Sequence, residues 1–154
     1  MLNNKYFSLA LIILITFSAS FIGSYATMAY KEPWYSELIL PTFNPPSAVF
    51  APVWTTLYIM MSVSIWLVWK RSFNNRVMTI YFVHLFFNAI WSVLFFGYHN
   101  ILLALIDLII ILGFIIWLMV IYFRENKISF YLMVPYLLWS SYAFVLNLTI
   151  LVLN

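Results

Sequence analysis

The chain contains no cysteine, only three glycines and only two histidines. Without cysteine there is no disulfide, no thiol nucleophile and no thiolate ligand for a metal. Three glycines leave little room for phosphate-binding loops, and no GxGxxG, P-loop or HExxH pattern occurs. The common catalytic and metal-binding motifs are therefore absent, and we expect neither a metal site nor a resident cofactor.

Charged residues are also scarce, at 7% of the chain, whereas hydrophobic residues make up 66%. A soluble domain carries about 25% charged residues, which help to cover its water-facing surface. A chain of 154 residues with so few charges must instead lie in lipid. Its net charge of +3 comes from basic residues scattered at the ends of apolar segments, which form no patch for nucleic acid. We therefore expect membrane lipid, and no nucleic acid, around this protein.

Five long apolar segments, separated by short polar breaks, predict the fold. They cover approximately residues 6–30, 47–69, 77–97, 101–123 and 129–152. At about 1.5 Å per residue, each is long enough to cross a hydrocarbon core of about 30 Å as an α-helix. The runs are continuous rather than alternating, which disfavours a β-barrel. We predict an all-α integral membrane bundle of five transmembrane helices in a single domain, residues 1–154, with a connector at residues 31–46.

Basic residues gather on one side of the predicted membrane, and this bias predicts the orientation. The six residues on the N-terminal side are Lys5, Lys70, Arg71, Arg76, Arg124 and Lys127. The other side has only Lys31. We predict that the N-terminus is inside, and that the C-terminus and the connector are outside.

The stretch from Trp34 to Trp54, which includes most of the connector, has an unusual composition. It holds four of the six prolines and two of the seven tryptophans. A simple membrane hairpin needs only a few polar residues, whereas this stretch is rigid, aromatic and apolar. We therefore expect it to pack onto the bundle as the lid or the wall of a binding cavity.

Polar side chains within the apolar segments are costly in a bilayer and should face protein or a cavity. Asp107 is the only acid inside a segment. It is either a cavity residue or proton site, or a hydrogen-bonding group that holds two helices together. In the third segment, the spacing places His84, Asn88, Trp91 and Phe95 on one helix face. This face either contacts a ligand or packs against other helices, with Asn88 as the polar contact.

The fifth segment places Trp139, Ala143 and Asn147 on one face, at intervals of four residues. Under the predicted topology, several polar and aromatic side chains converge in the outer half of the bundle: Trp54, Asn88, Asp107 and Asn147. Trp139 lies deeper, near the middle of the membrane. We expect a pocket there that opens toward the outside and is covered by the connector.

Several stretches of the sequence carry a family resemblance. The first, from residue 34, reads WYSELILPTFNPPSAVFAPVWTTLYIMMS, which is similar to the pattern WYxxLxKPxWxPPxWxFxPVWxxLYxxMG. Later stretches read NAIWSVLFFGYHN, ALIDL and VPYLLWSSYAFVLNLTI, in matching order and spacing. On these residues, the chain from Tyr30 onward resembles the TspO/MBR family, also called translocator protein or tryptophan-rich sensory protein.

The resemblance implies a five-helix bundle with a ligand cavity, which in this family is often a homodimer. Members of the family bind porphyrins, sterols and benzodiazepine-site drugs, and some promote light-dependent breakdown of porphyrin. The two indoles on which that breakdown depends match Trp54 and Trp139. The residues that match other pocket positions are Tyr35, Asn88, Asp107, Ala143 and Asn147. Pro45 of the connector and Trp91 of the third segment complete the predicted ligand-binding set.

The sequence departs from the family pattern at five positions. Leu40 stands in place of a lysine, Phe43 and Ala48 in place of tryptophans, His84 in place of a glutamine and Ser62 in place of a glycine. Leu40 removes a cation that would meet the propionates of a porphyrin, which leaves Lys31 as the only cation on the outer side. The missing indole at Ala48 would either widen the pocket or weaken stacking on a flat ligand. These departures bear on porphyrin affinity more than on the fold.

Three functions follow as hypotheses. The first is a membrane ligand-binding protein, a sensor, scavenger or transporter for flat hydrophobic molecules such as porphyrin, haem or a sterol. The second is an enzyme-like, light-dependent degradation of porphyrin, with Trp54 and Trp139 as the candidate catalytic residues. The third is an adaptor whose helix faces bind another membrane protein. No organelle signal is visible, so we expect a bacterial inner membrane as the location.

Overall fold

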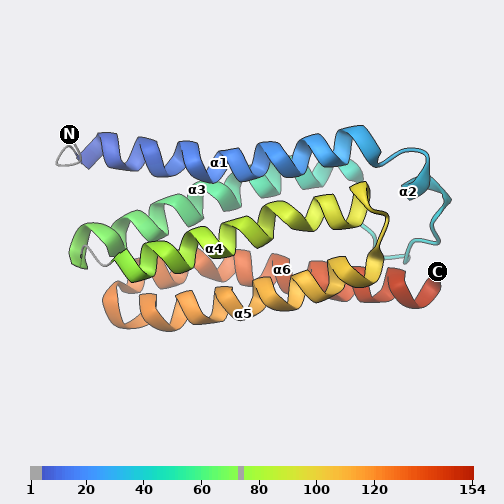
Figure 1. The fold of residues 1–154 in the computed structure, drawn as a ribbon. Coiled ribbons are helices and arrows are strands. Elements are labelled where there is room, and N and C mark those ends of the chain that lie inside the picture. The colour runs from blue at the N-terminus through green and yellow to red at the C-terminus, as the bar shows by residue number, and fades with distance from the viewer. Residues whose placement is uncertain (1–4, 73–74) are drawn as a thin grey trace.

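The computed structural model describes residues 5–72 and 75–154, and most of these residues are helical (Figure 1). The elements are α1 (Lys5–Tyr30), α2 (Trp34–Glu37), α3 (Ser47–Ser72), α4 (Asn75–Ser92), η1 (Val93–Gly97), α5 (Ile101–Glu125) and α6 (Lys127–Leu153). Five spans of helix, one of them made of α4 and η1 together, are long and apolar enough to cross a membrane. No strand occurs within residues 5–72 and 75–154. The predicted all-helical membrane bundle with five spans is confirmed.

Asparagine side chains begin the two helices that follow tight turns. The side chain of Asn100 accepts a hydrogen bond from the backbone N–H of Leu103 at 2.9 Å. The side chain of Asn126 accepts from the N–H groups of Ile128 and Ser129 at 3.0 and 3.3 Å. The first N–H groups of a helix have no partner within it, so these caps satisfy groups that are costly to leave unpaired. They set where α5 and α6 begin, and the short turns make α4, α5 and α6 antiparallel neighbours.

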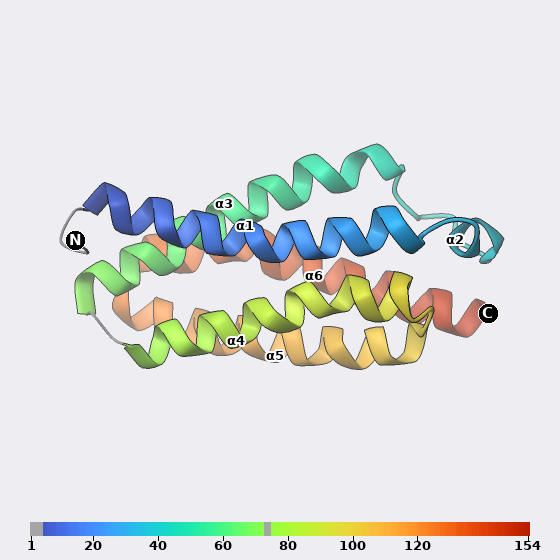
Figure 2. The same ribbon diagram turned by 45° about the horizontal axis from the view of Figure 1, so that its top comes forward.

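The five long helices form a closed ring. α1 packs against α3 and α4, α3 packs against α6, and α5 completes the ring between α6 and α4. Figures 1 and 2 show α2, the turn between η1 and α5, and the C-terminus at the same end of the bundle, which we call the connector end. The start of α1 lies at the opposite end. This arrangement encloses an interior that all five helices face.

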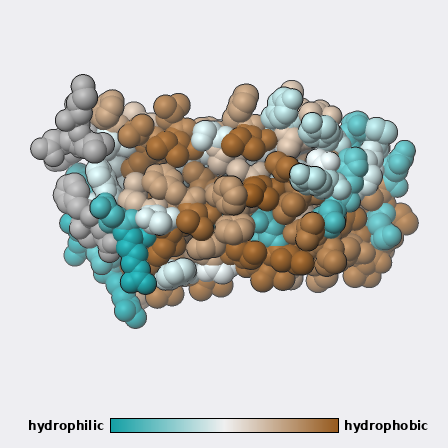
Figure 3. Space-filling model, viewed as in Figure 1, coloured by the Kyte–Doolittle hydropathy of each residue, from teal (hydrophilic) through white to brown (hydrophobic). Residues whose placement is uncertain are grey.

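The outer surface of the bundle is largely apolar. Figure 3 shows hydrophobic side chains over the middle of one face, with hydrophilic side chains gathered at the two ends. On α1, Phe21 is 73% exposed and Met28 is 86% exposed. Side chains of this kind turn outward when the surrounding medium is lipid rather than water, because contact with hydrocarbon costs them nothing.

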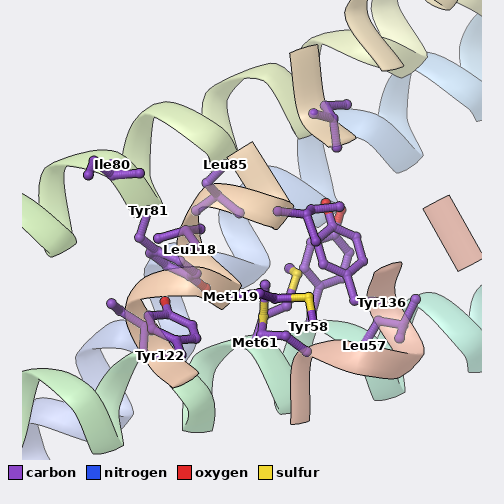
Figure 4. Close-up of a cluster of buried hydrophobic side chains, with 14 of the residues drawn as sticks. Leu57, Tyr58, Met61, Ile80, Tyr81, Leu85, Leu118, Met119, Tyr122 and Tyr136 are labelled. Carbon is purple, nitrogen blue, oxygen red and sulfur yellow. The ribbon is translucent and has the colours of Figure 1, made fainter. Parts of the chain in front are cut away.

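Away from the connector end, the interior is filled by apolar and tyrosine side chains (Figure 4). Tyr81, Tyr122 and Tyr136 are completely buried, together with Met61 and Leu118. Buried hydroxyls need partners, and that of Tyr81 lies 2.7 Å from the Thr16 hydroxyl on α1. The interior of the ring is therefore closely packed at this end.

Three local features depart from five regular helices joined by plain loops. The connector contains the short helix α2, which the sequence analysis did not predict. The third apolar segment ends in the π-helical turn η1, closed by a hydrogen bond from Tyr98 N–H to the Val93 carbonyl at 2.9 Å. Pro52 and Pro135 lie inside α3 and α6, where each removes one backbone N–H from its helix. None of these features changes the order of the spans.

Candidate functional site

A cavity of about 460 Å³ lies inside the ring at the connector end. All five long helices and the connector contribute to its wall. The main lining residues are Ser20, Gly23, Ser24 and Thr27 of α1; Phe50, Ala51, Trp54, Thr55 and Tyr58 of α3; Asn88, Trp91 and Phe95 of α4 and η1; Leu108 and Ile111 of α5; and Trp139, Ser140, Ala143, Leu146, Asn147 and Ile150 of α6. Pockets for drug-sized ligands measure about 300–1,000 Å³ and are mostly apolar with a few polar groups. The cavity has both properties.

Aromatic rings form two of the cavity walls. Trp54 on α3 lies against Tyr58, one helical turn further, with 5.5 Å between the ring centres. Trp139 on α6 meets the edge of Phe50 at 5.9 Å. Such contacts help to hold the indoles in place. The cavity is therefore bounded by rings from α3 and α6 that can stack on a flat molecule.

A hydrogen-bonded chain closes the bottom of the cavity. The Tyr58 hydroxyl donates to Asn88 Oδ1 at 2.5 Å, and Asn88 Nδ2 donates to the Tyr136 hydroxyl oxygen at 2.8 Å. The same oxygen lies 2.8 Å from His84 Nε2. If Tyr136 donates to His84, every one of these bonds has one donor and one acceptor. Asn88 thus lines the cavity while both of its polar atoms are occupied within the protein.

Charged and polar groups of the connector lie at the rim of the cavity. Lys31 pairs with Glu32 at 3.4 Å and lies 5.3 Å from the ring centre of Tyr35. A hydrogen bond from Ser36 to Glu32, together with Lys31, holds the pKa of that carboxyl below its usual value, so it stays ionised at neutral pH. Burial raises the pKa of Tyr35, and its protonated hydroxyl donates to Asn44 Oδ1 at 3.3 Å. The rim therefore presents one cation and one neutral hydroxyl.

The structure brings eight of the nine predicted ligand-binding residues into the wall of this one cavity. These are Tyr35, Pro45, Trp54, Asn88, Trp91, Trp139, Ala143 and Asn147. The face expected from the spacing of the fifth segment is present, because Trp139, Ala143 and Asn147 all line the cavity. One member of the face expected in the third segment does not line the cavity. His84 is completely buried beside Tyr136 and takes part in the packing between helices.

Asp107 is the predicted site residue that does not line the cavity. It is buried in α5, but the lining residues of that helix are Leu108 and Ile111. One step along a helix rotates a side chain by about 100°, so Asp107 and Leu108 face different directions. Its Oδ2 atom is buried and has no hydrogen-bond partner among the residues described. The sequence indicated the depth of Asp107 in the bundle but not its rotation about the helix axis.

Some residues of the wall were missed by the sequence analysis. Phe50 and Tyr58 lie four residues before and after Trp54, so the helical repeat that relates Trp139 to Ala143 would have found them on the same face. Lys31 was recognised only as a charge on the outer side, yet it lines the cavity. No comparable signal marks the contribution of α1, whose lining residues, apart from Met28, are small or hydroxylated.

The connector is fastened to the bundle at both of its sides. The Trp34 indole stacks on the His99 ring at 4.5 Å, and His99 Nε2 lies 3.2 Å from the Tyr30 carbonyl oxygen. On the other side, the Asn154 side chain accepts from Ile39 N–H at 2.9 Å and donates to its carbonyl at 3.2 Å. The connector is thus held over the cavity by a ring stack and by a paired amide contact.

The apolar ring of five spans and the walled cavity at one end define a multi-pass integral membrane protein with an internal cavity. The profile of the TspO/MBR family matches residues 11–153. The chain is 37% identical to tryptophan-rich protein TspO of Chlorobaculum tepidum over 99% of both chains. It is 36% identical to the protein of that name from Archaeoglobus fulgidus, over 92% of this chain and 94% of the relative. It is also 32% identical to the translocator protein of Homo sapiens, over 82% of this chain and 78% of the relative. The chain belongs to the TspO/MBR family, as its motifs predicted.

Proposed function

We propose that this protein binds a flat, largely apolar small molecule of the porphyrin type in the cavity at the connector end. The observation that carries the proposal is the placement of two indoles, Trp54 and Trp139, in the wall of a single cavity of about 460 Å³. Ring faces attract other ring faces, and each well-packed aromatic pair contributes about 0.5–1.5 kcal/mol beyond the burial of its area. A flat conjugated molecule can stack on these rings with a large contact area.

The rim of the cavity suits a ligand with an acidic edge. Lys31 is the only charged residue among the described lining residues, and it is the first residue of the connector. A carboxylate on the ligand would compete with Glu32 for this ammonium group. The exposed pair is weak, so exchanging one carboxylate for another costs little. A porphyrin, with its apolar plate and its propionates, has both properties.

The names of two relatives agree with a function that involves binding. One relative from Cereibacter sphaeroides is named tryptophan-rich sensory protein, and the human relative is named translocator protein. These names describe sensing and carriage, and both begin with binding. The proposal therefore covers the step that the two roles share.

Titration with protoporphyrin in detergent or nanodiscs tests the proposal. We expect saturable binding, seen as quenching of tryptophan fluorescence and a shift of the porphyrin absorption band. The double variant Trp54→Phe/Trp139→Phe should bind about tenfold more weakly or worse, because it loses two indole faces. Trp117→Phe is the matched control, since Trp117 is 46% exposed on α5 and does not line the cavity. Quenching that does not saturate, or equal affinity in all three proteins, contradicts the proposal.

The same two indoles favour a second function, light-dependent breakdown of porphyrin. Trp54 and Trp139 both line the cavity, so a bound porphyrin would be excited within contact of oxidisable rings. The titration extends to this question when samples are kept in light and in dark with oxygen present. Breakdown is supported if the porphyrin absorption band is lost in light but not in the dark. The loss should also be slower in the double variant than its weaker binding explains. A band that stays stable in light leaves binding as the only function.

We also propose that the protein resides in a bacterial inner membrane with its N-terminus inside and its connector outside. The support is the bias of basic residues toward the end of the bundle opposite the connector. Because the chain has no cysteine, single cysteines report the side of the membrane without interference. Tyr98→Cys, in the turn after η1, should react with a membrane-impermeant maleimide in intact cells, and Arg124→Cys only after permeabilisation. The reverse labelling pattern would contradict this orientation.

A further inference from the structure

The hydroxyl of a buried tyrosine is hydrogen-bonded to a histidine in the interior of the bundle. The Tyr136 oxygen lies 2.8 Å from His84 Nε2, and both side chains are completely buried. Asn88 Nδ2 donates to the same oxygen, so the proton of the Tyr136 hydroxyl is directed at His84. Neutral imidazole is a base as well as a hydrogen-bond acceptor. A phenol and an acceptor for its proton are therefore already in place in the folded protein.

This pair contacts the cavity wall through Trp54. The ring centres of Trp54 and Tyr136 lie 6.3 Å apart with 64° between their planes, so the edge of one ring meets the face of the other. Trp54 lines the cavity, whereas Tyr136 lies behind it in the packed interior. Aromatic rings in contact exchange an electron readily. An electron can therefore pass from Tyr136 to a residue that a molecule in the cavity touches.

A second tyrosine lies nearer to Trp54 but has a different partner for its proton. The ring centres of Trp54 and Tyr58 are 5.5 Å apart, and the Tyr58 hydroxyl donates to Asn88 Oδ1 at 2.5 Å. An amide oxygen accepts a hydrogen bond but does not take up a proton at neutral pH. A phenol that loses an electron must also lose its proton, because its radical cation is a very strong acid. Of these two tyrosines, Tyr136 is the one whose proton has a base to receive it.

We propose that Tyr136 and His84 form a proton-coupled redox pair that reduces Trp54 after Trp54 has lost an electron. The oxidant is a photoexcited conjugated ring molecule in the cavity, which removes one electron from Trp54 and becomes a radical anion. The Trp54 radical cation then takes one electron from Tyr136, while the Tyr136 hydroxyl proton moves to His84 Nε2. The products are neutral Trp54, a neutral tyrosyl radical and an imidazolium, so the positive charge stays within one hydrogen-bonded pair. When the radical anion returns its electron to Tyr136, His84 returns the proton.

The pair protects the wall of the cavity from oxidation. An indole radical cation is converted irreversibly to oxidised products in the presence of oxygen, whereas a tyrosyl radical reacts with oxygen much more slowly. The family pattern has a glutamine in place of His84, and the amide of a glutamine is not a base. The base is therefore a feature of this chain. The inference goes beyond ligand binding and rests on the proposed function only for the identity of the oxidant.

A photo-oxidant attached to the protein tests the pair without any molecule in the cavity. The chain has no cysteine, so Ala48→Cys carries a single ruthenium tris(bipyridine) label at an exposed position, about 9 Å along α3 from Trp54. A laser flash with ruthenium hexaammine as external electron acceptor oxidises the label, which then oxidises the indole. We expect the absorption of an indole radical to decay as that of a tyrosyl radical rises, and the tyrosyl radical to be seen by electron paramagnetic resonance.

Variants in the labelled protein assign each step to its residue. His84→Gln keeps a hydrogen-bond partner for Tyr136 but removes the base, so formation of the tyrosyl radical should slow about a hundredfold, the lower end of what a positioned base contributes. Tyr136→Phe and Trp54→Phe should each abolish the fast rise. Tyr58→Phe is the matched control, and its tyrosyl radical should form as in the wild type. If Tyr136→Phe fails to fold, His84→Gln and Trp54→Phe decide.

An unchanged rate in His84→Gln or in Trp54→Phe overturns the inference, and so does the absence of a tyrosyl radical in the wild type. A second measurement illuminates the unlabelled protein with protoporphyrin and oxygen and quantifies oxidised Trp54 by mass spectrometry. We expect oxidised Trp54 to accumulate several times faster in His84→Gln than in the wild type, and equal rates with bound porphyrin would also overturn the inference. If protoporphyrin does not bind, the proposed function fails, whereas the flash experiment still decides whether Tyr136 and His84 reduce Trp54.

Discussion

The variant Ala143→Phe is expected to abolish ligand binding while leaving the fold intact. Ala143 lies on the cavity face of α6, one turn from Trp139 and one turn from Asn147. A phenyl ring at this position enters a space of about 460 Å³ that the ligand must otherwise occupy. We expect the dissociation constant for protoporphyrin to rise at least a hundredfold, equivalent to about 2.7 kcal/mol.

The stability of the Ala143→Phe variant separates blocking from unfolding. The added ring points into open space rather than into a packed core, so overpacking strain is small. Filling the cavity should keep the melting temperature in detergent the same or raise it. Val145→Phe is the matched control, because Val145 is 49% exposed on the outer side of the same helix. Undiminished binding by Ala143→Phe would falsify the assignment of the ligand to this cavity.

The variant Tyr136→Phe is expected to cause the largest loss of stability among conservative changes in the bundle. The Tyr136 side chain is completely buried, and its hydroxyl contacts both Asn88 Nδ2 and His84 Nε2 at 2.8 Å. Removing the oxygen leaves a donor on Asn88 and a nitrogen on His84 without partners. An unpaired buried polar group costs about 1–3 kcal/mol, and we expect a loss of that size in the free energy of unfolding.

Unfolding in mixed detergent, followed by far-UV circular dichroism, measures this loss. Tyr131→Phe serves as the control, because Tyr131 lies on the same helix and is 65% exposed. Combining Tyr136→Phe with Asn88→Leu should cost less than the sum of the two single changes, since both remove the same hydrogen bond. Equal stability of Tyr136→Phe and Tyr131→Phe would show that the hydroxyl contributes nothing to the bundle.

Much of the site could be predicted from the sequence because it depends on helical spacing. The interval of four residues between Trp139, Ala143 and Asn147 is enough to place them on one face, whatever that face meets. The rotation of a helix within the ring is different, because it depends on all of its neighbours at once. For this reason, Asp107 was expected in the cavity wall, whereas its neighbour Leu108 lies there.

The hydrogen-bonded chain through Tyr136 had no signal in the sequence. A tyrosine in an apolar run is equally typical of a core position, a membrane-interface position and a cavity position. Its partners Asn88 and His84 lie some fifty positions away and on another helix. Pairing of this kind depends on which helices become neighbours, and no local pattern reports that.

The structure shows where three of the departures from the family pattern lie. Leu40 packs against the buried cluster at the connector end, and Phe43 meets the ring of Tyr142 at 6.3 Å. Ala48 is exposed at the start of α3. None of these three residues lines the cavity. Their effect on a ligand is therefore through the connector and its approach to the bundle, not through the wall that the ligand touches.

The contacts that hold the connector affect how fast a proposed ligand would enter and leave the cavity. The contact between Ile39 and Asn154 and the stack of Trp34 on His99 join exposed or half-buried groups at one end of the bundle. Local openings that break a few exposed contacts need far less free energy than separation of packed helices. We therefore expect the proposed ligand to enter and leave many times during the life of one folded bundle, with residence times set by the sixteen residues 31–46 rather than by the five spans.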